Sequence, residues 1–350
     1  MKVDFFLKHS KSLLNKLDSR LQVVVGNQSA DLDSITSAIS LAFYLNQTTT
    51  GKNFIPIINS TKSVIASKKP CTWMFDQLSV DLNNLIFLDD LNRDRINEVY
   101  LVDHNELDKR ENDLSLGELV SGVIDHHLDK GEFKSANPRN IDTRVGSNAS
   151  LVVAMIRQAQ IELDSSFANM LLFPIVNDTS NLTRNTHQID IEAVEYLIRF
   201  ASINRLELNS KLEELKFSSG GSEPVSELLR QDLKMYSGSW AMSSLTIGLI
   251  EWIRHGKILD DIVEFVNENR LFFFGILSFH REDGVYKRDL VLIGDEITIR
   301  GFVDTKMTSL TFIDAVYSPS TCCAIFKVND STLSRKYWQP VLENFLRYQV

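Results

Sequence analysis

The stretch GVIDHHLDKGEF, residues 122–133, joins a short apolar run to an acid and two adjacent histidines. Short apolar runs bounded by turn residues are typical of strands that are buried on both faces. Asp125, His126 and His127 therefore stand where a buried strand ends. Because the ligands of parallel α/β sheets gather beyond the carboxyl ends of the strands, this stretch predicts a functional site at one edge of a parallel sheet.

The first half of the chain repeats this alternation of short apolar runs with helical stretches. Strands are predicted at residues 21–27, 54–59, 84–90, 98–105 and 122–127. Helices are predicted at residues 34–45, 147–160, 166–177 and 188–215. Strands that alternate with helices in this way predict a parallel sheet that is covered on both faces.

The pattern changes after the segment KFSSGGSEP, residues 216–224, which is small and polar and holds the only Gly-Gly pair of the chain. Such a composition is typical of a linker. Beyond it, strands are predicted near residues 240–250, 271–280, 287–294 and 321–328, and helices near 256–269 and 334–347. We therefore predict an α/β protein with a parallel-sheet domain over residues 1–215 and a smaller C-terminal α+β domain over residues 225–350.

Length and composition limit the class of protein. With 350 residues, 43% hydrophobic and 24% charged, the chain has the composition of a soluble globular protein with room for two domains. No apolar run approaches the ~18 residues that a membrane-spanning helix needs. The net charge of −9 argues against a general nucleic-acid-binding protein. We therefore expect no membrane and no nucleic-acid partner, and a monomer, because no heptad or exposed apolar stripe predicts a dimer.

The cysteine pattern predicts the compartment. Cys71, Cys322 and Cys323 form no CxxC motif and no disulfide framework. Reduced cysteines in a protein core are typical of intracellular proteins. The start of the chain also lacks the apolar core of a signal peptide. The sequence therefore predicts a cytoplasmic protein.

Four polar clusters follow predicted strands or helices along the first half of the chain. They comprise Asp31 with Asp33, Asp103 with His104, Asp125 with His126 and His127, and Asp178. Each acid taken alone is better explained as a loop residue or a helix cap. Carboxylates that converge at one edge of a sheet would repel one another and fail to ionise unless cations lay between them. The clusters together therefore predict a metal site, and mixed carboxylate and imidazole ligands favour Mg²⁺, Mn²⁺ or Co²⁺ over a thiolate zinc site.

Local geometry suggests how these side chains divide their roles. Asp31 and Asp33, two residues apart in an extended loop, project to the same side, and each could hold one of two neighbouring ions. His126 and His127 are adjacent and are expected to project in opposite directions, so one is expected to bind metal and the other to contact substrate. Asp125 is expected to fix the tautomer of an imidazole without being a ligand itself.

These motifs resemble those of the DHH phosphoesterase superfamily. The resemblance rests on SADLDS (29–34), LVDHNE (101–106), DHH (125–127) and NDTSNL (177–182). In the second half, LLRQDLKMYSG (228–238) and SRKYWQPVLENF (334–345) resemble the C-terminal domain of the branch that contains family II inorganic pyrophosphatases, exopolyphosphatases and prune-type proteins. The resemblance spans nearly the whole chain, and the motifs occur in the order of the family.

The resemblance implies a role for each residue that matches a motif. The implied metal ligands are Asp31, Asp33, Asp103, His126 and Asp178, with Asp103 bridging two or more divalent ions. The implied phosphate contacts are His127, Lys234, Arg335 and Lys336, and the implied catalytic residues are Asp103 and His127. The implied active site lies in the cleft between the two domains, with a hinge near residues 216–224. Without the upstream motifs, the basic residues of the second domain would be explained as solvated surface residues.

Asn27 departs from one branch of the family. Family II pyrophosphatases carry a histidine there, and eukaryotic cytosolic exopolyphosphatases resemble this chain in having asparagine. An amide in place of an imidazole is a harder, neutral oxygen donor that suits Mg²⁺, so Asn27 is expected to line the metal site or to orient substrate. His127 separates the chain from prune-type proteins, which have arginine at that position. The GGGH-like motif of the nuclease branch is absent, which disfavours nuclease activity.

The sequence thus predicts a metal-dependent exopolyphosphatase that hydrolyses terminal phosphoanhydride bonds of inorganic polyphosphate and releases orthophosphate. Nucleoside tetraphosphates are a further candidate substrate. An inorganic pyrophosphatase is the alternative within the same class of enzymes. A catalytically weak regulatory or interaction protein that has kept the fold is the alternative from another class.

Overall fold

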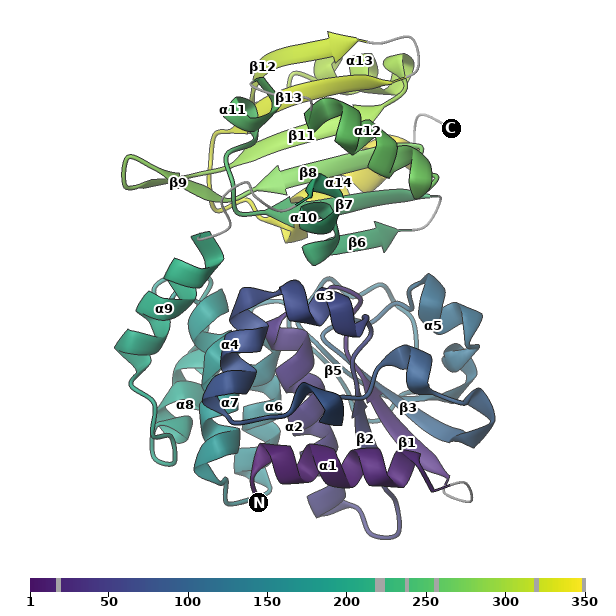
Figure 1. Ribbon diagram of the computed structural model, residues 1–350, viewed down its shortest axis with the longest axis vertical. Helices are drawn as coiled ribbons and strands as arrows, with labels where there is room; N and C mark the ends of the chain where they lie inside the picture. Colours follow the sequence, from purple (N-terminus) through teal and green to yellow (C-terminus); the bar gives the residue numbers. More distant parts are fainter. Residues whose placement is uncertain (17–19, 218–223, 237–238, 255–257, 318–320, 348–350) are drawn as a thin grey trace. The chain divides into compact units, whose positions relative to one another are not determined.

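A computed structural model describes residues 1–350 except 17–19, 218–223, 237–238, 255–257, 318–320 and 348–350. The chain folds into two compact units, Met1–Leu215 and Lys216–Val350 (Figure 1). Most of the predicted linker at 216–224 lies outside the described residues. Within the described ranges, every helix is too short or too polar to span a lipid bilayer.

The N-terminal unit is built on a five-stranded parallel sheet with the strand order β2-β1-β3-β4-β5. Its strands are β1 (Leu21–Val25), β2 (Phe54–Ile57), β3 (Ile96–Val102), β4 (Val120–Asp125) and β5 (Arg139–Ile141). Successive side chains enter two different cores: Val24 belongs to one, and Val23 and Val25 belong to the other. Burial on both faces explains why these strands are continuous apolar runs in the sequence.

One face of this sheet is covered by a layer of helices, and the other is covered by Leu13 and Leu14 near the N-terminus together with Ile86, Leu88 and Leu116. Figure 1 labels the α-helices of this part of the chain. They are α1 (Val3–Leu14), α2 (Leu32–Thr48), α3 (Lys62–Ser67), α4 (Lys69–Gln77), α5 (Lys109–Asp113), α6 (Asn148–Gln158), α7 (Ser165–Asp178), α8 (Gln188–Leu197) and α9 (Arg205–Phe217). Helices α2, α6, α7 and α8 pack against one another, and their buried residues form a single core with one face of the sheet.

The strand register brings the polar clusters to one edge. Val25 of β1 pairs with Leu101 of β3, and Val102 of β3 pairs with Ile124 of β4, so the three central strands end almost level. Gly26 allows the start of α2 to approach the end of β1 closely, because a Cβ atom there would lie 2.3 Å from the Ser34 hydroxyl oxygen in the first turn of α2.

Two predicted elements of this unit differ from the structure. Residues 84–90 do not form a strand; they contribute one bridge, Ile58 to Phe87, and otherwise form 3₁₀ turns at Leu82–Asn84 and Leu88–Asp90. The Asp90 carboxylate accepts the Phe87 N–H at 3.0 Å, which closes the second turn. The helix predicted at 188–215 is divided into α8 and α9, because the Asn204 side chain accepts the Leu206 N–H at 2.9 Å and starts a new helix.

The C-terminal unit contains a six-stranded mixed sheet with the order β12-β13-β11-β8-β7-β6. Its strands are β6 (Leu233–Tyr236), β7 (Trp240–Leu245), β8 (Phe273–Ser278), β11 (Asp289–Gly294), β12 (Leu310–Tyr317) and β13 (Cys322–Val328), and β9 (His280–Glu282) and β10 (Val285–Lys287) form a separate hairpin. Only β7 and β8 pair in parallel among the described strands of this sheet.

The described residues of this unit also form the helices α10 (Val225–Gln231), α11 (Leu249–Arg254), α12 (Ile258–Glu268), α13 (Glu296–Asp304) and α14 (Arg335–Arg347). Two hydrophobic cores cover the two faces of its sheet. The predicted fold class, an N-terminal parallel sheet joined to a smaller domain of mixed architecture, is confirmed. Strands β6 and β12 were not predicted, because their half-exposed side chains lack a continuous apolar run.

Candidate active site

Asp103 follows β3 directly and brings a carboxylate to the carboxyl edge of the sheet. Its backbone N–H donates to the Ile124 carbonyl at 3.0 Å, so the chain remains attached to β4 one residue past the strand. Its φ of +64° lies in the left-handed region, which costs most residues about 1–2 kcal/mol and which aspartate adopts more readily than most. The turn places the Asp103 side chain beside the end of β4.

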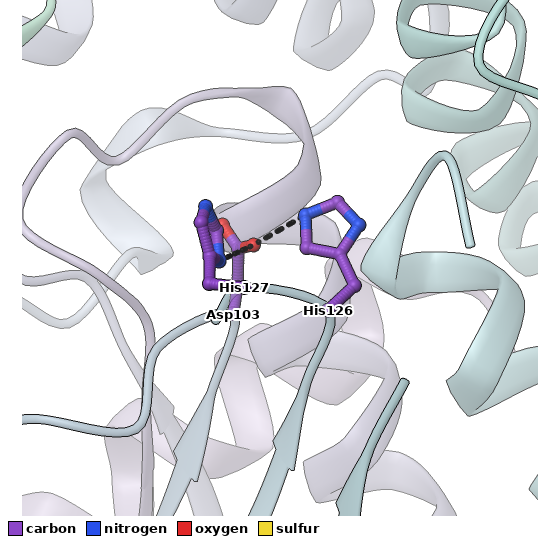
Figure 2. A group of neighbouring side chains, drawn as sticks. All are labelled: Asp103, His126 and His127. Atoms are coloured by element: carbon purple, nitrogen blue, oxygen red, sulfur yellow. Dashed lines mark ion pairs between the residues drawn. The ribbon is translucent and has the colours of Figure 1, made fainter. Parts of the chain in front are cut away.

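Asp103, His126 and His127 form one group of side chains (Figure 2). Asp103 Oδ1 lies 3.2 Å from His126 Nε2 and 3.6 Å from His127 Nδ1. The two rings stand at 84° with their centroids 4.8 Å apart, so the expectation that these adjacent histidines project in opposite directions is wrong. The reason is the turn after β4, where Asp125 Oδ1 accepts the backbone N–H groups of both histidines at 2.7 and 3.1 Å.

Different acceptors orient the two imidazole rings. His126 Nδ1 lies 3.1 Å from the Val145 carbonyl, which can only accept, so Nδ1 carries the hydrogen and Nε2 faces Asp103. His127 Nδ1 lies 2.8 Å from Asp125 Oδ1. Asp125 therefore orients the ring of His127, and a backbone carbonyl orients the ring of His126.

Asp125 is completely buried, and its charge depends on its neighbours. Burial alone would raise its pKa, but the charge and hydrogen bond of His127 hold the pKa of Asp125 well below its usual range. The Asn105 amide also donates to Asp125 and to the Leu128 carbonyl. The sequence reasoning missed Asn105 as part of this site; its position within the LVDHNE motif, two residues after Asp103, was the available signal.

Asp33 is buried next to this group, and a helix that lies far away in the sequence holds its carboxylate. Its carboxylate accepts the Ser147 hydroxyl at 2.9 Å and the backbone N–H groups of Asn148 and Ala149 at 2.6 and 2.8 Å, at the start of α6. Asp33 Oδ2 also lies 3.6 Å from His126 Nε2. Burial, together with the nearby negative charge of Asp103, raises the pKa of Asp33 to about 6. A carboxylate in this position is poised to share a cation.

Asp31 and Asp178 lie outside the group formed by Asp103 and the two histidines. Asp31 caps α2 by accepting the Ser34 N–H at 3.0 Å, and its negative charge contributes to the raised pKa of Asp33. Asp178 is the last residue of α7 and accepts the Asn177 amide at 2.9 Å. Both side chains are half-buried. Their roles as metal ligands remain predictions.

Asn27 is buried at the end of β1 and points its amide nitrogen, not its oxygen, at the acidic group. The amide N–H₂ donates to Asp103 Oδ2 at 2.5 Å and to the Asp103 carbonyl at 3.1 Å. The amide oxygen accepts the Ser29 N–H at 2.9 Å and the Ala30 N–H at 3.3 Å. In this arrangement Asn27 orients Asp103 through hydrogen bonds, which differs from the expected neutral oxygen donor toward a metal ion.

The predicted basic residues lie in the C-terminal unit. Lys234 is half-buried on β6, and Arg335 and Lys336 begin α14. The Arg335 guanidinium donates to the carbonyl and the carboxylate of Asp232, both at 2.7 Å. Asp232 lies two residues before Lys234 and was missed by the sequence reasoning. Its contact with Arg335 ties the start of α14 to the segment that leads into β6.

The donors of the N-terminal unit fit a divalent ion. Asp33 and Asp103 offer carboxylate oxygens 3.6 and 3.2 Å from the Nε2 nitrogen of His126. Cys71 supplies no thiolate, because burial raises the pKa of its thiol to about 12. Oxygen and imidazole donors without thiolate favour Mg²⁺, Mn²⁺ or Co²⁺. The crowding of buried carboxylates is the observation that calls for such a cation.

Comparison with known proteins identifies relatives over most of the chain. Residues 22–175 match the family model described as DHH family, N-terminal domain. A Schizosaccharomyces pombe protein named "Putative exopolyphosphatase" is 31% identical over 255 residues, which are 67% of this chain and 66% of that protein. The chain thus spans about two thirds of that relative. The Rattus norvegicus protein "Exopolyphosphatase PRUNE1" is 26% identical over 347 residues, 93% of this chain and 75% of that protein.

Other similar proteins are named as inorganic pyrophosphatases. A Streptococcus thermophilus protein named "Probable manganese-dependent inorganic pyrophosphatase" is 27% identical over 216 residues, 61% of this chain and 66% of that protein. The crystal structure of a Methanococcus jannaschii "putative family II inorganic pyrophosphatase" superposes with a TM-score of 0.68 at 20% identity, covering 90% of this chain and 96% of that one, and shows the same fold. The chain therefore belongs to the DHH family, whose N-terminal domain it carries over residues 22–175.

Proposed function

We propose that this protein is a divalent-metal-dependent exopolyphosphatase, which hydrolyses terminal phosphoanhydride bonds of inorganic polyphosphate and releases orthophosphate. The DHH family domain and the similarity to proteins named exopolyphosphatase and inorganic pyrophosphatase support the class, a hydrolase of phosphorus-containing anhydrides. The observation that carries the proposal is the Asp103 carboxylate, in contact with His126 and His127 at the edge of a parallel sheet.

Asp33, Asp103 and His126 would hold the ions, joined by the predicted ligands Asp31 and Asp178. When bound, two divalent ions supply an attacking water of lowered pKa and neutralise phosphate charge. The chain's contribution is to fix the donors before substrate arrives. The start of α6 holds Asp33, the Asn27 amide holds Asp103, and the Val145 carbonyl directs His126 Nε2 toward both acids.

His127 is the proposed contact to the phosphoryl group. The Asp125 carboxylate lies 2.8 Å from Nδ1 and favours the positively charged ring. Because Nδ1 is engaged with Asp125, Nε2 is the nitrogen that can contact the substrate. A charged imidazole donates a strong hydrogen bond to a phosphate oxygen. His127 would therefore stabilise the charge that develops on the phosphoryl group during in-line attack.

The basic residues of the C-terminal unit are proposed to bind the phosphate chain. A guanidinium offers a planar fork that matches phosphate oxygens, and lysine ammonium groups add point charges. Asp232, which precedes Lys234 by two residues, would keep the Arg335 guanidinium oriented. The polyphosphate leaving group is weakly basic, so the reaction needs no strong general acid.

Two observations place polyphosphate ahead of pyrophosphate in this proposal. Residue 27 is asparagine, as in the exopolyphosphatases that the chain resembles, and not the histidine of family II pyrophosphatases. Relatives named exopolyphosphatase also align over 67% and 93% of this chain. An inorganic pyrophosphatase is the second candidate, favoured by the relatives with that name.

The test measures orthophosphate release from long-chain polyphosphate and from pyrophosphate, each with Mg²⁺ and with Mn²⁺, and compares wild type with Asp103→Asn. We expect faster release from polyphosphate and almost none from the variant. A preference for pyrophosphate would reverse the ranking of the two substrates. No release from either substrate with any divalent ion would instead favour a protein that has kept the fold without the activity.

A further inference from the structure

A lysine without a charged partner is buried beside the candidate metal site. Lys68 joins α3 to α4 and is 8% exposed. Its Nζ donates to the backbone carbonyl of Ser29. Within the part of the chain that the structure describes, this neutral carbonyl is the only hydrogen-bond partner of the Lys68 ammonium group, and that group forms no ion pair. Lysines are rarely buried so completely unless an anion pairs with them.

The residue that receives this hydrogen bond belongs to the loop between β1 and α2. Ser29 donates its N–H and its hydroxyl to the Asn27 oxygen at 2.9 and 2.6 Å, and Asn27 in turn donates to Asp103. The Ser29 hydroxyl also lies 3.4 Å from Asp31 Oδ2. The Lys68 ammonium is therefore two hydrogen-bonded residues away from Asp103 and adjacent to the loop that carries the predicted ligands.

A second observation places Lys68 and Asp31 in the same surroundings. The thiol of Cys71 is buried one turn into α4, and burial is the main reason for its raised pKa. The charge of Lys68 lowers this pKa, and the charge of Asp31 raises it. Both charged groups thus lie near the same thiol, although no ion pair joins them among the described contacts.

We propose that Lys68 binds a phosphate group of the substrate, which supplies the anion that the folded chain lacks at this position. This inference rests on the proposed function for the identity of the anion. A divalent cation cannot be the partner, because it would repel the ammonium group. A phosphate oxygen meets both needs, because it can contact metal ions held by the acids and accept a charge-assisted hydrogen bond from Lys68.

A purely structural explanation makes a different prediction about stability. If Lys68 served only to attach the α3–α4 segment to the Ser29 carbonyl, replacing it would destabilise the free protein. If Lys68 awaits an anion, replacing it with methionine, which is apolar and similar in length, removes an uncompensated buried charge. The free protein should then be as stable as wild type or more so.

The experiment compares Lys68→Met with Lys62→Met, a control at an exposed lysine of α3 that contacts Asn83. Titration calorimetry measures binding of inorganic phosphate to each full-length protein in the presence of Mg²⁺, and thermal unfolding measures stability without phosphate. We expect Lys68→Met to weaken phosphate binding about tenfold or more, with an unchanged or higher unfolding temperature. Lys62→Met should match wild type in both measurements.

Two results would overturn the proposal: unchanged phosphate affinity in Lys68→Met, or a loss of affinity that occurs equally in Lys62→Met. Lys68→Arg adds a further check, because it keeps the charge and should retain more of the affinity than Lys68→Met. The outcome is separable from the proposed function. If wild type hydrolysed neither polyphosphate nor pyrophosphate, the function would fail, while the difference in phosphate affinity would still decide the role of Lys68.

Discussion

The two units of this protein handle charge in opposite ways. In the N-terminal unit, Asp33 and Asp103 are buried close together, and their donors are backbone N–H groups, a hydroxyl and an amide. In the C-terminal unit, Lys234, Arg335 and Lys336 are half-buried or exposed, and Arg335 is paired with an acid. Buried like charges need counter-ions to ionise, whereas exposed ones are screened by water. The N-terminal edge is therefore suited to metal ions and the C-terminal residues to a mobile polyanion.

The largest expected effect comes from removing the acid at the centre of the N-terminal group. Asp103→Ala should lower the rate of orthophosphate release by about a thousandfold, because metal ions contribute several kcal/mol of charge stabilisation in the transition state. The same change should leave the far-ultraviolet circular dichroism spectrum unchanged. Asp113→Ala, at an exposed acid of α5, is the control. Near wild-type turnover in Asp103→Ala would exclude Asp103 as the central ligand.

Divalent ions should stabilise the protein through the same acids. At a concentration of about 100 times the dissociation constant, Mn²⁺ or Mg²⁺ should raise the free energy of unfolding by about 2.7 kcal/mol, because the ion binds only the folded chain. Chelation should reverse the gain, and Asp103→Ala should abolish it. Calorimetric scans with and without the ion measure both. Equal stabilisation of wild type and variant would place the ion elsewhere.

The basic residues of the C-terminal unit should affect catalytic efficiency less severely. Arg335→Met should lower kcat/KM for polyphosphate by about tenfold to a hundredfold, the range expected for a charge-assisted hydrogen bond to a phosphate oxygen. Arg347→Met, at the exposed end of the same helix, should have little effect and is the matched control. Steady-state kinetics across salt concentrations measure both. Loss of activity in Arg347→Met alone would contradict the assigned role of Arg335.

The smallest expected effect concerns the choice of substrate and metal. Asn27→His should raise the ratio of pyrophosphate to polyphosphate hydrolysis on the order of tenfold and shift the metal preference toward Mn²⁺, because an imidazole replaces the amide that contacts Asp103. The measurement is the substrate and metal panel described above. If neither ratio changes, Asn27 does not decide specificity.

The sequence was sufficient to predict secondary structure where a pattern of neighbouring residues specifies it. The alternation of apolar runs with helices predicted the parallel sheet, because strands buried on both faces must be apolar throughout. The exception at residues 84–90 shows the limit of this rule. That run is apolar, but Asp90 closes a 3₁₀ turn with its backbone, and periodicity does not report such a bond.

The candidate active site, too, was predicted from the sequence only in part. The sequence alone identified acids and histidines after successive elements, and resemblance to a family assigned their roles. It did not show how those side chains are held. Lys68 resembled any surface lysine, because burial of a single long side chain leaves no periodic trace in a sequence. Asp232 likewise had no signal apart from its position beside Lys234.

What the sequence by itself determined is the parallel sheet of the N-terminal unit and the placing of Asp103, Asp125 and His126 at strand ends, because both follow from patterns a few residues long. The tertiary structure decided which partner each side chain meets. Asp33 contacts the start of α6, 116 residues further along the chain, and Arg335 contacts Asp232 across 103 residues. Such pairs form only when packing brings distant segments together, so no local pattern encodes them.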